Sequence, residues 1–339
     1  MVPTPRVAAF EHESVLVEEV VRYLSPRSDG VYCDCTVGGA GHSARLSGRI
    51  VGIDRDPAAL EAARARLGPE ATLVHGNFGD VAAILAELNV PRVDGFVLDL
   101  GVSSPQLDHA NRGFSFSHDG PLDMRMDPTA GPTALDLVRE LEADELRDVI
   151  SELGEERFAR KIARAIKEAV EADRLHTTAE LAALCARAIP TIEQRKSKIH
   201  PATRTFQALR IAVNRELDQL AQFLAAFPDL LAPGGRCVAI SFHSLEDRLV
   251  KNAFRDLEWT SSLPPVHAER AGERVEAVAH VLTKKPVFAS DDEVARNPRA
   301  RSARLRACER TTAPNVPANS AGSPHPAGTP PRKGPRRAF

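Results

Sequence analysis

The chain has 339 residues, of which 43% are hydrophobic and 27% charged, and its net charge is −2. This composition is globular, and the length suffices for a large domain or two domains with a sizeable core. No stretch approaches the roughly 20 apolar residues of a membrane span, and no basic-then-apolar leader opens the chain. We therefore expect a cytoplasmic protein.

The five cysteines are too few and too scattered for a disulfide framework. Cys33 and Cys35 would share one face of a strand, but no partners for a zinc site accompany them. We expect buried thiols and no metal. Residues 311–339 hold seven of the 25 prolines, four basic residues and no acid. This composition predicts a disordered, Pro-rich basic tail that is solvated, with contact to a polyanion as the alternative.

Helical and strand-like patterns alternate along the first hundred residues. Apolar positions at helical spacing predict a helix over 14–25, with Ser14 as its N-cap. A second helix over 57–67 carries a proline in its first turn. Four apolar runs predict strands, at 31–37, 50–53, 71–78 and 93–101. This alternation is typical of a parallel sheet built from βα units.

The alternation then stops for about a hundred residues. Residues 106–211 show no convincing strand but contain helical patterns at 155–172 and 178–189. A long amphipathic helix over 203–227 follows, and further strands are expected at 233–243, 280–285 and 304–310. We predict a Rossmann-like, seven-stranded doubly wound α/β sheet with a helical insertion between strands 4 and 5. The sheet domain would comprise residues 1–105 and 212–310, and the insertion residues 106–211.

Glycines lie where the first predicted strand ends, in the segment GGAGHS that begins at Gly38. A glycine-rich turn between strand and helix lets the backbone approach a ligand, and Asp54, at the end of strand 2, is placed to accept the ribose hydroxyls of an adenosine. Gly39, Gly41 and Ala44 also fit the dinucleotide pattern GxGxxG/A. The loop alone therefore leaves NAD, S-adenosylmethionine (AdoMet) and a tight turn without ligand as alternatives.

The fourth predicted strand ends in DLGVSSPQLD, residues 99–108. A short polar segment with proline at this place receives the base in enzymes that methylate amines. An exocyclic amine is a poor nucleophile because its lone pair is conjugated with the ring. Acceptors such as Asp99, Ser103 and Ser104 would hold the amine protons and turn the lone pair toward the methyl group. The alternative is a plain loop whose hydroxyls form local turns.

These motifs together resemble the RsmH (MraW) family of AdoMet-dependent methyltransferases, which act on cytosine N4 of bacterial small-subunit (16S) rRNA. The resemblance runs from about His12 to Arg310. Its most specific pieces are DLGVSSPQLD, RGFSF and GPLDMRMD, supported by HESVLVEEV, GIDRDP, HGNF, GEERFARKIA, HPATRTFQALRI and NPRARSARLR. It implies a class I methyltransferase fold in which the helical insertion binds the substrate.

The resemblance also implies cofactor contacts. Transferred by position, they are Gly39, Ala40, Gly41, His42, Asp54, Phe78, Asp99 and Gln106. Among these, Asp54 would hold the ribose, Phe78 would lie beside the adenine, and Asp99 and Gln106 would lie near the methionine end. Two positions depart from the family pattern: Cys35 stands where glycine or alanine is expected, and Ala40 where glycine is expected. Both are small changes that affect only loop detail.

A basic segment points to the RNA side. Residues 195–215 contain six lysines and arginines and no acid, which suits phosphate neutralisation but also suits a solvated helix face. On the helix, Arg210 and Asn214 lie off the apolar stripe, so we expect them to face outward or toward a cleft. The resemblance favours RNA contacts, with candidates Lys198, His200, Arg204 and His243. Phe114 and Phe116 are candidates to stack on a flipped base, or else belong to the core.

The sequence thus predicts an enzyme that transfers a methyl group directly from AdoMet to the N4 amine of one cytidine in the decoding region of 16S rRNA. Asp99, Ser103 and Ser104 are the expected catalytic residues. Its expected partner is small-subunit rRNA or the 30S particle. Two alternatives stay open: an NAD-linked oxidoreductase that uses the glycine loop, and a non-catalytic rRNA-binding or assembly factor with the same fold.

Overall fold

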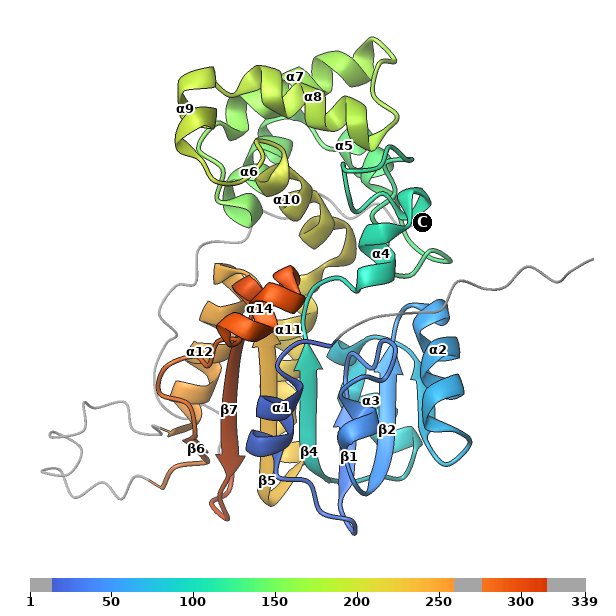
Figure 1. The fold of residues 1–339 in the computed structure, drawn as a ribbon, viewed down its shortest axis with the longest axis vertical. Coiled ribbons are helices and arrows are strands. Elements are labelled where there is room, and N and C mark those ends of the chain that lie inside the picture. Colours follow the sequence, from blue (N-terminus) through green and yellow to red (C-terminus); the bar gives the residue numbers. More distant parts are fainter. Residues whose placement is uncertain (1–13, 259–275, 316–339) are drawn as a thin grey trace, which may run out of the picture.

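A computed structural model describes residues 14–258 and 276–315 (Figure 1). They form a sheet of seven strands in the order β3-β2-β1-β4-β5-β7-β6. β1 to β5 run parallel, and β7 runs antiparallel to both β5 and β6. Their bounds are β1 Val31–Asp34, β2 Arg49–Asp54, β3 Thr72–His75, β4 Val93–Asp99, β5 Leu231–Ser241, β6 Ala279–Val281 and β7 Arg304–Arg310. The predicted seven-stranded sheet is confirmed, with β6 shorter than expected. The tail predicted to be disordered lies outside the described residues from position 316 onward.

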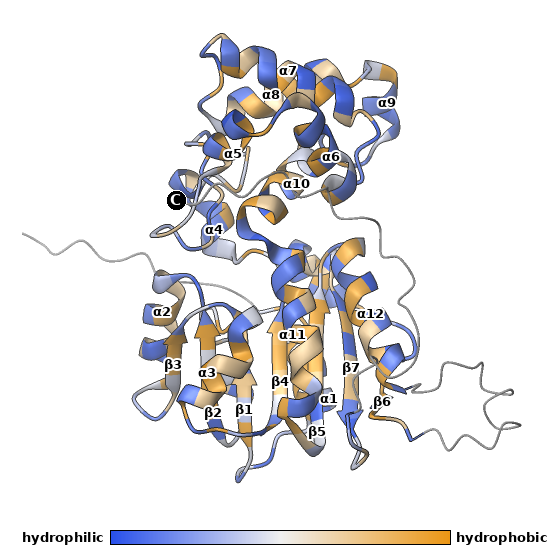
Figure 2. Cartoon of the chain, turned by 180° about the vertical axis from the view of Figure 1, so that it is seen from behind, coloured by the Kyte–Doolittle hydropathy of each residue, from blue (hydrophilic) through white to orange (hydrophobic). Residues whose placement is uncertain are grey.

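Helices cover both faces of the sheet, as the doubly wound prediction requires. On one face lie α3 (Val81–Glu87), α11 (Glu216–Leu230) and α12 (Ser244–Glu258); on the other lie α1 (Val17–Leu24), α2 (Pro57–Leu67) and α14 (Asp291–Arg296). Strand side chains alternate between the two layers. Cys33 and Phe96 pack with α3, α11 and α12, while Tyr32 and Val97 pack with α1. The strands are apolar and the outer helix faces hydrophilic because only the outer faces meet water (Figure 2).

The first elements are shorter than the sequence predicts. α1 begins at Val17 after Leu16, so Ser14 is not its N-cap. The Ser14 side chain instead packs against Gly41, where an added Cβ would come within 1.8 Å of the Ser14 Oγ. β1 ends at Asp34 rather than Val37, since the chain turns there into the glycine segment.

The helical insertion stands above the carboxyl edge of the sheet (Figure 1). Its helices are α4 Ser104–Asp108, α5 Ala134–Glu140, α6 Ala143–Gly154, α7 Ala159–Glu171, α8 Thr178–Ala188, α9 Thr191–Lys196 and α10 Thr203–Asn214. Of the short 3-10 helices, η3 Ala110–Arg112 lies in the insertion. The others, η1 Ser43–Arg45, η2 Phe78–Asp80 and η4 Pro298–Ser302, lie in the sheet domain. The helix predicted over 155–172 begins at Ala159 because Glu155, with φ 49°, ends α6. The insertion has an apolar cluster distinct from those under the sheet, and the proposed limits of 106 and 211 stay a prediction.

One expected helix is in fact two. The apolar stripe over 203–227 predicted a continuous helix, but Arg215, in the left-handed region at φ 52°, separates α10 from α11. α10 packs in the insertion against α6, and α11 packs against the sheet. The stripe runs through the break because each helix buries its own apolar face in a different core.

The break between α10 and α11 is stabilised by hydrogen bonds of Asn214, which is only 2% exposed. Its Nδ2 donates to the Met124 and Arg210 carbonyls at 2.7 and 2.9 Å, and its Oδ1 accepts from the Met126 amide at 2.8 Å. The Asn214 carbonyl also accepts from Arg55 Nη1 at 2.9 Å. The sequence predicts that Arg210 and Asn214 face outward or toward a cleft. Asn214 is buried in polar contacts at the junction but lines a small cavity there. The Arg210 side chain, 15% exposed, pairs with Glu216 and does not face open solvent.

Asn214→Ala should lower the free energy of unfolding by about 2–4 kcal/mol, because it leaves the Met124 carbonyl and Met126 amide buried without partners. Urea unfolding followed by circular dichroism measures this. Gln222→Ala, at an exposed position of α11, is the control and should stay within about 0.5 kcal/mol of the unsubstituted protein. Equal effects of the two substitutions would contradict the role of Asn214.

Candidate active site

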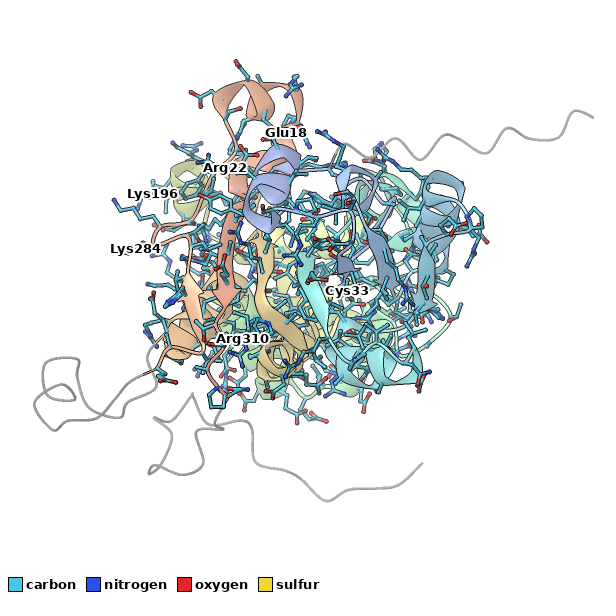
Figure 3. All side chains as sticks on the ribbon, turned by 90° about the horizontal axis from the view of Figure 1, so that it is seen from below. Glu18, Arg22, Cys33, Lys196, Lys284 and Arg310 are labelled. Carbon is cyan, nitrogen blue, oxygen red and sulfur yellow. The ribbon has the colours of Figure 1, made fainter. Side chains whose placement is uncertain are left out.

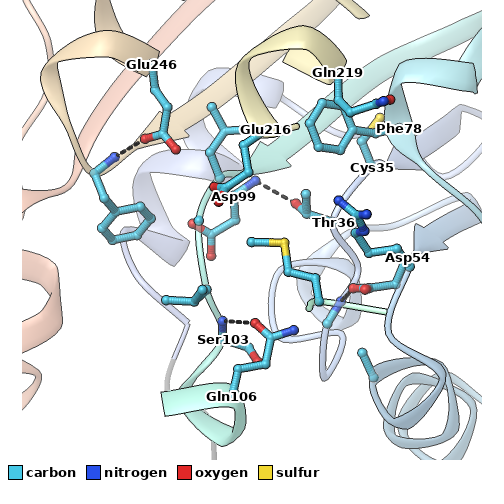
Figure 4. Close-up of a pocket in the computed structure, with 18 of the residues that line it drawn as sticks. Cys35, Thr36, Asp54, Phe78, Asp99, Ser103, Gln106, Glu216, Gln219 and Glu246 are labelled. Atoms are coloured by element: carbon cyan, nitrogen blue, oxygen red, sulfur yellow. Dashed lines mark hydrogen bonds between the residues drawn. The ribbon is translucent and has the colours of Figure 1, made fainter. Parts of the chain in front are cut away.

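A cavity lies at the carboxyl ends of β1, β2 and β4, next to the loops that follow these strands (Figure 4). Ligands of open α/β sheets bind at this edge. The first turns of α11 and α12 complete the wall. The charged lining residues are Asp54, Asp99, Glu216 and Glu246 against Arg55 and Arg299. Because acids outnumber bases, the cavity favours a ligand with positive charge.

Asp54 ends β2 and is held in a fixed orientation. Its Oδ2 accepts a hydrogen bond from the Gly38 amide at 2.8 Å, and its Oδ1 accepts one from the Asp56 amide at 2.9 Å. Burial raises the pKa of Asp54 to about 6, although both hydrogen bonds oppose the shift. Each oxygen keeps a lone pair for a further donor, such as a ligand hydroxyl.

Asp99 ends β4, and its amide donates to Thr36 Oγ1 at 2.7 Å. Its Oδ1 is buried and has no hydrogen-bond partner among the described residues. Its Oδ2 lies 3.9 Å from His42 Nδ1, and burial raises the pKa of Asp99 to about 6 while His42 opposes the shift. An acceptor left unsatisfied in a buried place is costly, and this makes Asp99 a candidate for ligand contact.

The glycine segment lies beside the cavity. Gly38 lines it, whereas Gly39, Ala40, Gly41 and His42 do not. Ala40 adopts φ 58°, which explains why glycine is the expected residue there. His42 is buried, with Nε2 2.8 Å from the Val15 carbonyl oxygen. The cofactor role of these four residues stays a prediction.

Phe78 and Gln106 both line the cavity, as predicted. Phe78 meets Phe223 of α11 edge to face, with ring centroids 6.3 Å apart. Gln106 is already engaged: its Oε1 accepts from the Ser103 amide and its Nε2 donates to Asp56 Oδ2, each at 3.0 Å. Gln106 therefore shapes the cavity wall through bonds to both neighbouring loops.

The predicted catalytic residues come together. Ser103 and Ser104 lie at the N-terminus of α4 and line the cavity with Asp99, from which Gly101 turns the chain at φ 97°. The three residues therefore line one cavity, and their catalytic roles stay a prediction.

The structure adds two cavity residues that the sequence did not single out, Glu216 and Glu246. Glu216 accepts with both oxygens from Arg210, at 2.8 and 2.9 Å. The Glu246 carboxylate accepts from the Phe242 amide at 2.8 Å and lies 3.0 Å from His243 Nε2. Burial would raise the pKa of Glu246, but His243 and Arg210 hold it below its ordinary value. In the sequence, the position of Glu246 in the first helical turn after β5 is the one local feature that points to the cavity.

The candidate RNA residues fall in two places. His200 and Arg204 line a second cavity, in the insertion, and Lys198 is exposed beside it. Arg204 donates to the Glu155 carbonyl at 3.0 Å, and His200 stacks on Phe116, with ring centroids 4.5 Å apart. His243 instead sits at the sheet edge with 9% of its side chain exposed. The candidate RNA residues therefore lie apart: Lys198, His200 and Arg204 in the insertion, and His243 in the sheet domain.

Two further sequence motifs meet the structure here. Phe114 is buried and Phe116 packs against the insertion core, which favours packing over base stacking. Arg125, in the motif GPLDMRMD, forms a two-point ion pair with Asp123 at 2.7–2.9 Å.

All five cysteines are free and buried, and Cys33 Sγ lies 3.8 Å from Cys35 Sγ. Figure 3 shows Cys33 in the interior of the sheet, whereas Lys196 and Lys284 point outward. Within residues 14–258 and 276–315, no group of three or more metal-ligating side chains occurs. No helix among them is long and apolar enough to cross a membrane.

Comparison with known proteins decides the family. The model of the MraW methylase family matches residues 9–311. The chain belongs to this family. It is 50% identical to the ribosomal RNA small subunit methyltransferase H of Sorangium cellulosum, over 91% of this chain and 93% of that protein. The protein of the same name from Anaeromyxobacter sp. strain K is 51% identical, over 89% of this chain and 99% of that one.

The MraW methylase family assignment agrees with the sheet. The strand order, with a reversed β7 inserted next to β5, is that of class I methyltransferases. An rRNA methylase from Streptococcus thermophilus aligns with a TM-score of 0.37 and 8% identity, over 87% of this chain and 94% of that one. The family match over residues 9–311 gives no support to the dinucleotide alternative.

Asp99→Asn should stabilise the ligand-free protein at neutral pH. The folded pKa of about 6 lies above the unfolded value of about 3.9, so ionised Asp99 lowers stability as pH rises from 4 to 6. The variant should unfold with about 1–3 kcal/mol more free energy at pH 8 and with little difference at pH 4. Urea unfolding at both pH values measures this. A variant equally or less stable at pH 8 would show that the Asp99 charge is already compensated.

Proposed function

We propose that this methyltransferase uses AdoMet to methylate the exocyclic N4 amine of one cytidine in the decoding region of 16S rRNA, by direct transfer. The family match over residues 9–311 carries the proposal. The names of relatives about 50% identical add the small ribosomal subunit. The cytidine N4 specificity comes from the resemblance of the strand-4 motif, whose Asp99, Ser103 and Ser104 line one cavity.

The residues at the cavity fit AdoMet. Asp54 offers two oriented oxygens for a ribose, and Phe78 supplies an apolar wall beside them. The unpartnered Asp99 Oδ1 offers an acceptor to a cationic group. We assign Gly39, Ala40, Gly41, His42, Asp54, Phe78, Asp99 and Gln106 to the cofactor. Bound AdoMet supplies a methyl group on a sulfonium, which is strongly electrophilic.

The protein's part in the reaction is alignment. Asp99 and the Ser103 and Ser104 hydroxyls accept the N–H groups of the target amine and so turn its lone pair out of conjugation. An ionised Asp99 performs this role, and its pKa of about 6 leaves it mostly ionised at pH 7.5. The insertion closes the opposite side through Met126 and limits water there.

The insertion would hold the RNA. Lys198 and Arg204 provide positive charge to phosphates, and His200 lies between them in the sequence. His243, at the sheet edge beside Glu246, is assigned to whatever nucleotide reaches that side of the cavity. The target base must leave its stack to enter. We therefore assign sequence-independent binding of the RNA backbone to the insertion and the methyl transfer to the sheet edge. We further propose that the enzyme is cytoplasmic.

Labelled AdoMet and small subunits that lack the modification test the function. Nuclease digestion and nucleoside mass analysis should give N4-methylcytidine at a single decoding-region site. Label on another nucleoside would contradict the cytidine assignment. Absence of label with AdoMet bound would favour the non-catalytic assembly factor.

Asp99→Ala should reduce methylation by about 10³-fold, because the amine loses its main acceptor, while RNA binding stays unchanged. Filter binding of the RNA and the nucleoside assay measure the two effects. Asp108→Asn, an exposed acid at the end of α4, is the matched control and should retain methylation. Loss of RNA binding in Asp99→Ala would show that Asp99 serves the RNA rather than the reaction.

Direct transfer predicts that no thiol attacks the base. Cys35 lines the cavity, but burial raises the pKa of its thiol well above the ordinary value, which keeps it protonated and unreactive. Cys35→Ala should therefore keep methylation within about threefold of the unsubstituted protein. Cys185→Ala and Cys237→Ala should behave alike. Loss of chemistry in any of the three, with folding and AdoMet binding intact, would contradict direct transfer.

A further inference from the structure

Asp56 lies two residues beyond Asp54, and it does not line the cavity; it is 5% exposed. Its amide donates to Asp54 Oδ1 at 2.9 Å. Its own Oδ1 accepts from the Ala58 amide at 3.1 Å and caps α2. A residue buried in this way contacts no ligand but fixes both the strand end and the following helix.

The other oxygen of Asp56 contacts the segment that follows β4. Asp56 Oδ2 accepts from Gln106 Nε2 at 3.0 Å and from Arg112 Nη1 at 2.7 Å. Arg112 Nη2 donates in turn to the carbonyls of Arg125 and Met126, at 3.0 and 2.8 Å. Gln106 and Met126 both line the cavity. One carboxylate therefore connects three segments of the wall: the end of β2, the substrate loop (residues 103–112) and the strap (residues 124–126).

We propose that Asp56 is a positioning residue that couples cofactor binding at Asp54 to the order of the substrate loop and the strap. The inference rests on the proposed use of AdoMet. A ligand that fixes Asp54 also fixes the Asp56 amide and, through its side chain, Gln106 and Arg112. Both side chains of the Asp56–Arg112 ion pair are largely buried, at 7% and 15% exposure, so loss of either partner leaves the other charge uncompensated. Cofactor binding thus prepares the surface that receives the amine.

The coupling is measured by amide hydrogen exchange with S-adenosylhomocysteine (SAH), the stable product form of the cofactor, on the full chain. In the unsubstituted protein SAH should slow exchange near Asp54 and, by roughly five- to tenfold, in the substrate loop and strap. In Asp56→Asn and Arg112→Met the protection near Asp54 should remain. The protection of loop and strap should disappear.

Arg125→Met is the matched control. Arg125 lies in the same region and forms a comparable ion pair with Asp123, at 22% and 19% exposure, but it has no bond to Asp56. This control should keep the protection of the substrate loop. Equal protection of the loop in Asp56→Asn and the unsubstituted protein would overturn the proposal, as would equal loss in Arg125→Met and Arg112→Met.

Asp56→Asn and Arg112→Met could lose loop protection because they fail to fold, so the milder Arg112→Lys is measured as well. The lysine keeps a positive charge near Asp56 but cannot also reach both carbonyls, so loop protection should be intermediate. Full protection in this variant would show that charge alone suffices and would overturn the role of the bridge. In the methylation assay kcat should fall about 10²-fold in Arg112→Met while SAH affinity stays within about tenfold.

Calorimetric titration of the unsubstituted protein with SAH tests the proposed cofactor separately. SAH binding without protection of the substrate loop would overturn the coupling and leave the proposed function standing. No SAH binding by the unsubstituted protein would overturn both. Methylation of a nucleoside other than cytidine, with the coupling intact, would overturn only the proposed substrate.

Discussion

The carboxyl ends of β1, β2 and β4 all meet at one edge, and that edge collects carboxylates that burial penalises. Asp54 and Asp99 both have pKa values raised to about 6 by this burial. A fold selected only for stability would place apolar residues or paired charges there. The unsatisfied Asp99 Oδ1 is thus a cost in the ligand-free state that a cationic ligand would offset.

The insertion is held over this edge by polar contacts rather than by a shared apolar core. Its own apolar cluster is separate from the clusters of the sheet. Two residues that follow β2 bond to the insertion: Asp56 accepts from Arg112, and Arg55 donates to the Asn214 carbonyl. Hydrogen bonds depend on direction, so they fix the angle of the insertion where apolar packing would let it slide.

The sequence predicts those parts of the site whose chemistry is local. Asp54, Asp99 and Ser103 each follow a strand, so the topology of a parallel sheet places them together. Glu216 and Glu246 come from helix starts more than a hundred residues beyond Asp99, and no motif indicates that they line the same cavity. The break at Arg215 was hidden for a related reason. An apolar stripe indicates that a helix has a buried face, not which core that face meets.

The distribution of charge separates the two ligands the protein must handle. The cavity walls are rich in acids, while the exposed part of the insertion around Lys198 also carries Arg195 and Lys196. An RNA backbone is repelled by the first surface and attracted by the second, whereas a cationic methyl donor prefers the first. Only an uncharged base can leave the backbone on the insertion and enter the acidic cavity at small electrostatic cost. Under the proposed function, an acidic cavity that repels phosphates would therefore admit the nucleotide base first.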